Sequence, residues 1–215
     1  MTEQTIEQLD ARDLFRAAYE NRYTWDSNFP GYTADLAVTR SGETHTGSIR
    51  VNPDLSVEVT GFTDEATKGA VQNQLQGLIT HRRRSSFEQT HGKHVFSFGD
   101  TDSAGTQAIL VQGDAMGSHY RLRGKEVCQV SRVIGRMPFT IDHLQSIDTG
   151  AGYLSGQYNA VFRNPETNEV SGISKYHDTY EEIGGYYVLA RQVVEAEEQG
   201  SPTVTDFTFS NLKLL

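Results

Sequence analysis

The sequence predicts an α+β protein in which one large antiparallel sheet curls into an incomplete barrel covered by two helices. The first observation is that the stretch from Met137 to Leu215 divides into five runs rich in Tyr, Phe, Val, Ile and Thr. Each gap between the runs carries the Gly, Pro, Asn or Asp that turns require. The second observation is that two earlier segments place apolar residues at helical spacing instead. Because twist accumulates from strand to strand, a sheet of about a dozen strands is expected to curl.

Length, charge and cysteine content limit the class of protein. A chain of 215 residues suits a single domain, residues 1–215, with a core that needs no disulfide or metal. The net charge of −9 argues against broad binding to nucleic acid or to anionic membranes. Cys128 lies in the apolar run EVCQVSRVI, which predicts a buried, inert thiol. The acidic N-terminus does not resemble a signal peptide and no stretch is long enough to span a bilayer, so we expect a cytoplasmic protein.

The N-terminal part predicts one helix followed by three strands. Residues 6 to about 23 contain no Gly or Pro and place apolar side chains near one face, which is typical of a helix docked on a sheet. The TWDSNFPG segment ends this helix because Pro30 lacks an amide donor, and we expect Trp25 and Phe29 to anchor the crossing loop. From Gly31 apolar residues recur at every second position in three runs. These runs predict an opening meander.

A second helix is predicted over about residues 64 to 84, with Thr63 as its N-cap. The helix ends in HRRR, whose cations complement the helix dipole at the carbonyl end. The alternative is a patch that binds phosphate or nucleic acid. After the loop SSFEQTHGK, about nine further strands complete the sheet. The apolar stripe of the helix consists of Val71, Leu75, Leu78 and Ile79.

The predicted elements resemble a known carrier fold. A helix, the meander GYTADLAVTRSGETHTGSIRVNP, a second helix and the closing strands from GYLSGQYNAVF to TVTDFTFSNLKLL resemble the incomplete barrel of LolA, LolB and related lipoproteins, in which helices cover an apolar cavity. RAAYENRYTWDSNFPGY and VIGRMPFTIDHL resemble a family of uncharacterised cyanobacterial and plastid proteins, over nearly the whole chain. The lipobox cysteine and export signal of the lipoprotein carriers are missing. The resemblance therefore implies the architecture and not lipoprotein transport.

No motif predicts catalysis or metal binding. His91, His94 and the pair His177-Asp178 are the candidate ligands, but zinc needs three or four converging ligands and each group supplies two at most, so we interpret them as solvated loop residues. Ser103 lies in a DSAG turn without a G-x-S-x-G elbow. The glycines of DTGAGYLSG precede a strand, whereas a dinucleotide fingerprint precedes a helix. The sequence predicts no catalytic residue, metal or cofactor.

Aromatic residues are the remaining feature, with ten Tyr, ten Phe and one Trp. In a closed barrel such residues simply fill the core. A wide sheet covered by only two helices instead leaves part of its concave face unfilled, and such a face can bind an apolar ligand. The predicted ligand-binding residues are Phe96, Phe98, Tyr120, Leu122, Tyr158, Phe162, Leu75 and Leu78.

Three functions are compatible with these patterns. The first is a non-enzymatic carrier that holds an apolar small molecule, such as a lipid, pigment or isoprenoid, in the half-barrel. The second is a protein-interaction or assembly factor without a small ligand, which the family resemblance associates with photosynthetic membranes. The third is an enzyme that works through His177, Asp178 or the nearby tyrosines, and it has the fewest supporting residues.

Overall fold

The computed structural model describes residues 10–113, 119–198 and 201–215, and over these residues twelve strands form one antiparallel sheet. The strand order is β3-β2-β1-β12-β11-β10-β9-β8-β7-β6-β5-β4. The opening meander is β1 (Tyr32–Arg40), β2 (Glu43–Val51) and β3 (Val57–Thr60). The remaining strands are β4 (Val95–Thr101), β5 (Gln107–Gln112), β6 (His119–Arg123), β7 (Glu126–Ile134), β8 (Met137–Asp148), β9 (Tyr153–Arg163), β10 (Val170–Ile183), β11 (Tyr186–Glu198) and β12 (Ser201–Leu214).

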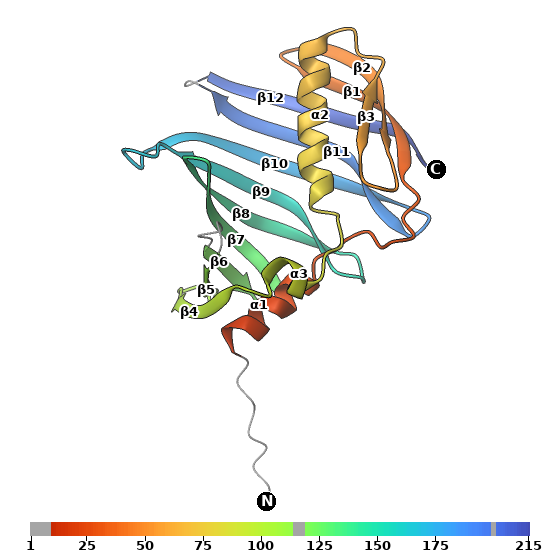
Figure 1. Cartoon of the computed structure of the whole chain (residues 1–215). Coiled ribbons are helices and arrows are strands. Elements are labelled where there is room, and N and C mark those ends of the chain that lie inside the picture. Colours follow the sequence, from red (N-terminus) through yellow and green to blue (C-terminus); the bar gives the residue numbers. More distant parts are fainter. Residues whose placement is uncertain (1–9, 114–118, 199–200) are drawn as a thin grey trace, which may run out of the picture.

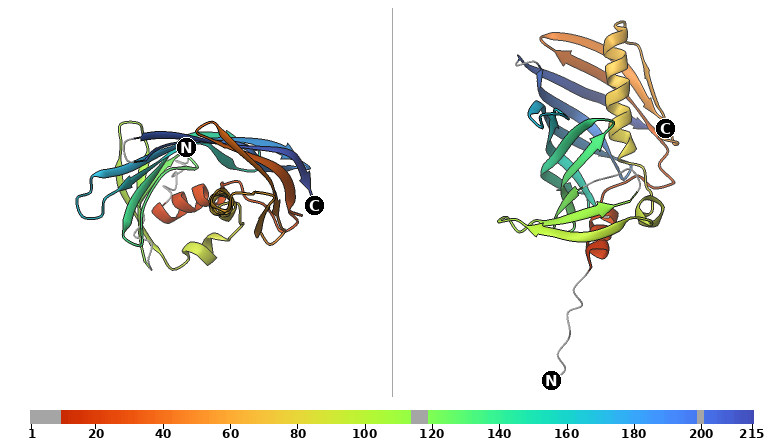
Figure 2. Two further views of the ribbon diagram at one scale, coloured as in Figure 1. Left: turned by 90° about the horizontal axis from the view of Figure 1, so that it is seen from above. Right: turned by 60° about the vertical axis from the view of Figure 1, so that its left-hand side comes forward.

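The sheet is curled and open, which confirms the predicted fold class. The last strand, β12, pairs with β1, so the opening meander extends the long C-terminal sheet, and β3 and β4 are its two edges (Figure 1). Three strands precede the long helix and nine follow it, as predicted. Seen from above, the sheet wraps around helices that lie on its concave side (Figure 2). In the described residues, none of the helices is long and apolar enough to cross a membrane.

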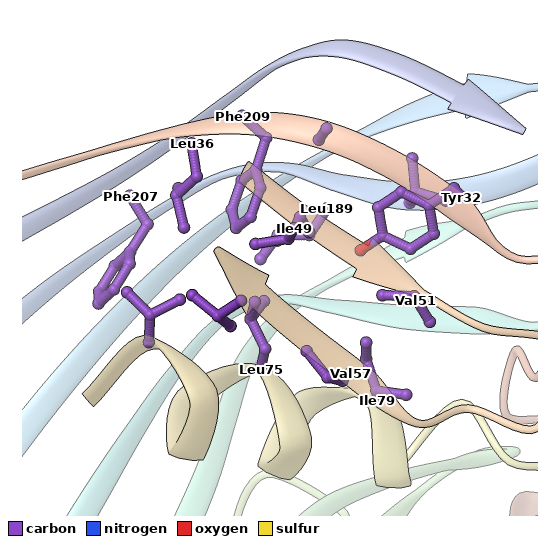
Figure 3. Close-up of a cluster of buried hydrophobic side chains, with 14 of the residues drawn as sticks. Tyr32, Leu36, Ile49, Val51, Val57, Leu75, Ile79, Leu189, Phe207 and Phe209 are labelled. Carbon is purple, nitrogen blue, oxygen red and sulfur yellow. The ribbon is translucent and has the colours of Figure 1, made fainter. Parts of the chain in front are cut away.

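The long helix α2 (Glu65–Thr80) covers one half of the concave face and forms the first core. Leu75 and Ile79 face the sheet between strands β3 and β12, as Figure 3 shows. Leu75 is 2% exposed and lies in one cluster with Phe207 and Phe209 of β12. Leu78, the fourth member of the predicted stripe, is only half-buried at the edge of this cluster.

The predicted N-cap of α2 was wrong by one residue. Asp64 caps the helix, because its carboxylate accepts a hydrogen bond from the Thr67 amide at 2.7 Å, and Thr63 lies outside the cap. A carboxylate is the better cap at this position because it also complements the positive end of the helix dipole. The helix ends at Thr80, so the arginines after His81 lie beyond its last turn.

The other half of the concave face is covered by α1 (Ala11–Glu20) and the short helix α3 (Phe87–His91). Residues 6–9 of the first predicted helix lie outside the described residues. The α3 segment was predicted as a loop, but Ser86 and Gln89 form a reciprocal capping box that stabilises one helical turn. Phe15 of α1 is the centre of this second core.

Two smaller predictions are confirmed. Trp25 and Phe29 stack at 4.0 Å in the loop after α1, and the Trp25 indole donates to the Tyr187 carbonyl at 3.1 Å, so the pair anchors that loop on the sheet. Cys128 is 9% exposed and its Sγ donates to the Arg121 carbonyl at 3.3 Å.

The Cys128 thiol is expected to be slow to react in the native protein. Burial raises the pKa of the thiol, and the thiolate is the reactive form. A disulfide-exchange reagent should therefore label the folded protein much more slowly than protein unfolded in guanidinium. Immediate stoichiometric labelling of folded protein would contradict this assignment.

Candidate functional site

Four of the eight predicted ligand-binding residues belong to the two cores. Phe96, Tyr120 and Leu122 lie in the second core, where the Phe15 ring is 5.2 Å from Phe96 and 4.6 Å from Tyr120. Leu122 is 2% exposed. The fourth residue is Leu75 of the first core. These side chains contact other core residues and the structure explains them without a ligand.

The other four residues are at least partly accessible, and the structure does not bring them together around one cavity. Phe98 is 44% exposed on edge strand β4, whereas Leu78 is half-buried on α2. Tyr158 and Phe162 are half-buried on the concave face of β9. Two depressions of about 380 Å³ and about 10 Å³ lie elsewhere on the molecule, and none of the eight residues lines either of them.

Tyr158 and Phe162 belong to two aromatic rows that cross the middle of the sheet between the two cores. In the first row, His143 of β8, Tyr158 of β9 and Tyr176 of β10 are register partners, and the two tyrosine rings stack at 4.6 Å. In the second row, Phe139 pairs with Phe162 across β8 and β9. All five side chains are half-buried. We refer to these five residues as the aromatic rows.

A line of small side chains begins between the two rows on β9 and continues to β11. Ala160 of β9, Ser174 of β10 and Ala196 of β11 are register partners in one line across the sheet. On antiparallel strands the residues directly opposite each other share a face, so this line lies on the same concave side as the rings. The middle of the concave face is therefore apolar and aromatic, with the least side-chain bulk along its centre line.

A buried polar network connects α2 to the sheet beside the aromatic rows. Gln192 of β11 is fully buried and donates from Nε2 to Asp178 Oδ1 at 2.7 Å and towards Tyr158 Oη at 3.4 Å. Gln74 of α2 donates in turn to Gln192 Oε1. The Tyr180 hydroxyl lies 3.2 Å from Asp178 Oδ2. Each buried polar atom of this network thus has a partner, and the network fixes the helix against strands β10 and β11.

Asp178 is the titratable centre of the network. Burial raises its pKa to about 6, against hydrogen bonds from Gln192 and Tyr180 that favour the ionised form. Arg82 follows α2 and donates to Tyr180 Oη at 3.0 Å. Its positive charge therefore lies near Asp178 and partly opposes the rise in the Asp178 pKa. In the folded protein the Asp178 carboxyl group is therefore mostly neutral below about pH 6.

The His177-Asp178 pair does not form a catalytic dyad. The two residues alternate along β10, so Asp178 faces the concave side and His177 is exposed on the other face, with Nε2 3.4 Å from Gln157 Nε2. The interpretation of His91 as a solvated residue was wrong. It is 3% exposed between Phe15 and Phe87, with Nδ1 3.0 Å from His94 Nδ1. Groups of three or more metal-ligating side chains are absent from the residues that the structure describes.

Sequence reasoning missed the polar network. One signal was present, because Tyr176, Asp178 and Tyr180 alternate along the segment KYHDTY and so share a face. Gln74 and Gln192 gave no signal, since they are far apart in the chain and meet only through packing of α2 on β11.

Comparisons with known proteins give a family and weak structural similarities. The model of a family described as "Protein of unknown function (DUF3386)" matches residues 6–215. No curated protein matches the chain. Several solved structures are similar to it at low identity. An outer membrane lipoprotein-sorting protein domain from Vibrio parahaemolyticus has a TM-score of 0.33 and 10% identity, and the match covers 92% of this chain and 88% of that chain.

The second structure is a DUF1329 family protein from Desulfovibrio piger, with a TM-score of 0.30 and 11% identity. The match covers 95% of this chain and 91% of that chain. The third is the complex of MucA and MucB from Pseudomonas aeruginosa, with a TM-score of 0.28 and 10% identity. The match covers 93% of this chain and 93% of the matched chain. These TM-scores are too low to carry an argument about function.

Proposed function

Since the chain belongs to the DUF3386 family, whose function is unknown, we propose from the geometry of the sheet that it is a non-enzymatic binding protein for an apolar small molecule. The observation that supports this proposal is the position of the aromatic rows. They lie between two filled cores, yet both rows remain half-buried on the concave face. Accessible apolar surface on a concave face is typical of a ligand site.

The dimensions of the aromatic rows favour a small ligand over a protein surface. The line of small side chains reaches from β9 to β11, and Ile141 of β8 is its next register partner. Four strands spaced about 4.8 Å apart span about 14 Å. A lipid chain or an isoprenoid of that length could lie on the small residues and contact a ring on each side, whereas a stable protein partner buries about 800 Å².

A bulky residue on the centre line should block the site. We expect Ala196→Trp to abolish the fluorescence gain of the neutral apolar probe N-phenylnaphthylamine, because the indole would occupy the half-buried β11 end of the centre line. The matched control is Glu197→Trp, which places the same indole on the opposite, solvent-exposed face of β11. Probe binding should be retained in the control. Leu122 is unsuitable for this test because a larger side chain in a filled core measures packing.

The experiment also decides between binding and structural roles. Circular dichroism and urea unfolding of both variants establish that each is folded. If folded Ala196→Trp binds the probe as the unsubstituted protein does, the proposed site is wrong.

Edge strand β4 supports a second candidate function, protein interaction. Val95 is 64% exposed and Phe98 is 44% exposed on this strand, which in the described sheet pairs with β5 alone. An edge strand with exposed apolar residues can accept a strand from another chain. Under this alternative, Val95→Lys would abolish association with a partner and leave probe binding unchanged.

A further inference from the structure

Among the residues that the structure describes, three arginines pack against tyrosine rings. In the described part of the chain, Arg22, Arg82 and Arg132 have no carboxylate within salt-bridge distance. The protein carries 28 acidic and 19 basic residues, so unpaired arginines are not a result of scarce carboxylates. Four other arginines of the described chain form ion pairs with carboxylates: Arg12, Arg16, Arg121 and Arg191.

Arg132 of β7 has an unsatisfied buried donor. Its Nη2 donates to Tyr120 Oη at 2.6 Å, and its guanidinium carbon lies 5.6 Å from the centre of the Tyr120 ring. Its Nε is buried and has no hydrogen-bond partner among the described residues. A buried donor of a charged group that stays unpaired costs free energy, and an anion bound to the accessible part of the same guanidinium group would offset that cost.

Arg82 and Arg22 are also placed on tyrosines. The Arg82 guanidinium carbon lies 5.6 Å from the Tyr180 ring centre and bonds the Tyr180 hydroxyl. The Arg22 guanidinium carbon lies 3.9 Å from the Tyr19 ring centre, and its Nε donates to the Tyr19 carbonyl at 2.9 Å. A cation on an aromatic ring keeps its remaining N–H groups available for an acceptor.

Of the three arginines, Arg132 adjoins the proposed apolar site. Arg132 is the register partner of Phe139, which pairs with Phe162, so the second aromatic row has a guanidinium group at one end. An elongated ligand lying along this row would place its terminal group beside Arg132.

We propose that the ligand is an amphiphile with an anionic head group, a carboxylate or a phosphate, which Arg132 binds. This inference rests on the proposed function. Guanidinium groups bind carboxylate and phosphate through paired charge-assisted hydrogen bonds, and the aromatic rows contact the apolar chain. Asp178 does not compete for Arg132, because Gln192 and Tyr180 hold its carboxylate.

The test is displacement of N-phenylnaphthylamine by ligands that differ only in the head group. Palmitate and hexadecyl phosphate should displace the probe at concentrations about tenfold lower than methyl palmitate, since one charge-assisted hydrogen bond contributes about 1.4 kcal/mol or more. Arg132→Gln should remove this preference and leave displacement by methyl palmitate unchanged. Arg132→Lys should restore part of it.

The control variant is Arg50→Gln. Arg50 is exposed on β2 and donates to Asn52 Oδ1 at 2.8 Å, so Arg50→Gln changes the net charge by the same amount as Arg132→Gln without touching the concave face. This control should keep the preference for the anionic amphiphiles.

The outcomes separate the two proposals. Equal displacement by palmitate and methyl palmitate overturns the head-group inference and leaves apolar binding intact. Failure of the probe to bind the unsubstituted protein overturns both. Binding of acetate or inorganic phosphate as tightly as of palmitate overturns the amphiphile and identifies a site for free anions. Retention of the preference in folded Arg132→Gln also overturns the inference.

Discussion

Replacing Leu75 by Ala is expected to lower the free energy of unfolding by about 2–5 kcal/mol, which is the usual cost of truncating a fully buried leucine. Leu75 is 2% exposed at the centre of the contact between α2 and the opening meander. The strands around it are held in place by neighbouring residues of the same core, so the cavity left by the substitution cannot fully collapse. Urea unfolding monitored by tryptophan fluorescence measures the change, because Trp25 lies in the same core.

Leu78→Ala is the matched control for this prediction. Leu78 lies on the same helix but is half-buried, so the substitution removes less buried surface. We expect its cost to be less than half that of Leu75→Ala. Equal costs for the two variants would mean that α2 is rotated relative to the arrangement described in Figure 3.

Local patterns predicted the elements of this fold well. Alternation of apolar residues from Gly31 onward indicated the strands, because one face of these strands packs against the core and the other faces solvent. The helix α2 followed from the spacing of Val71, Leu75 and Ile79, all of which are buried. The short helix α3 was missed although its capping box from Ser86 to Gln89 is visible in the sequence.

The candidate site was harder to predict because it depends on contacts between distant segments. Alternation shows which face of a strand a residue occupies but not which helix covers that face. Tyr120 and Tyr158 therefore looked equivalent in the sequence, whereas α1 covers Tyr120 and the first core ends before the Tyr158 ring. The pairing of Asp178 with Gln192 depends in addition on the strand register of β10 and β11.

Replacing Asp178 by Asn is expected to make stability less dependent on pH. Burial raises the pKa of Asp178 from its usual 3.8 to about 6 in the folded protein. The folded state thus binds this proton more tightly than the unfolded state does. For a carboxyl group shifted in this direction, stability is highest below about pH 4, falls as the pH rises to about 6 and stays lower above that value.

The size of the effect follows from the difference between the folded and unfolded pKa values. The difference corresponds to about 2–3 kcal/mol between about pH 4 and about pH 7.5. Asn has the shape of the protonated acid. Its oxygen can accept from Gln192 Nε2 and its amide can donate to Tyr180 Oη, so the network is preserved. The two proteins should have similar stability near about pH 4, and the variant should be more stable by about 2–3 kcal/mol near about pH 7.5.

Asp206→Asn supplies a control of opposite sign. A hydrogen bond from Arg191 lowers the pKa of Asp206, so its ionised form stabilises the folded state at neutral pH and this contribution is lost as the pH falls. Urea unfolding of the three proteins across this pH range gives the differences directly. A stability difference between Asp178→Asn and the unsubstituted protein that stays constant with pH, or that favours the unsubstituted protein at neutral pH, would show that Asp178 is not buried beside Gln192. In that case α2 does not pack against β10 and β11 as described.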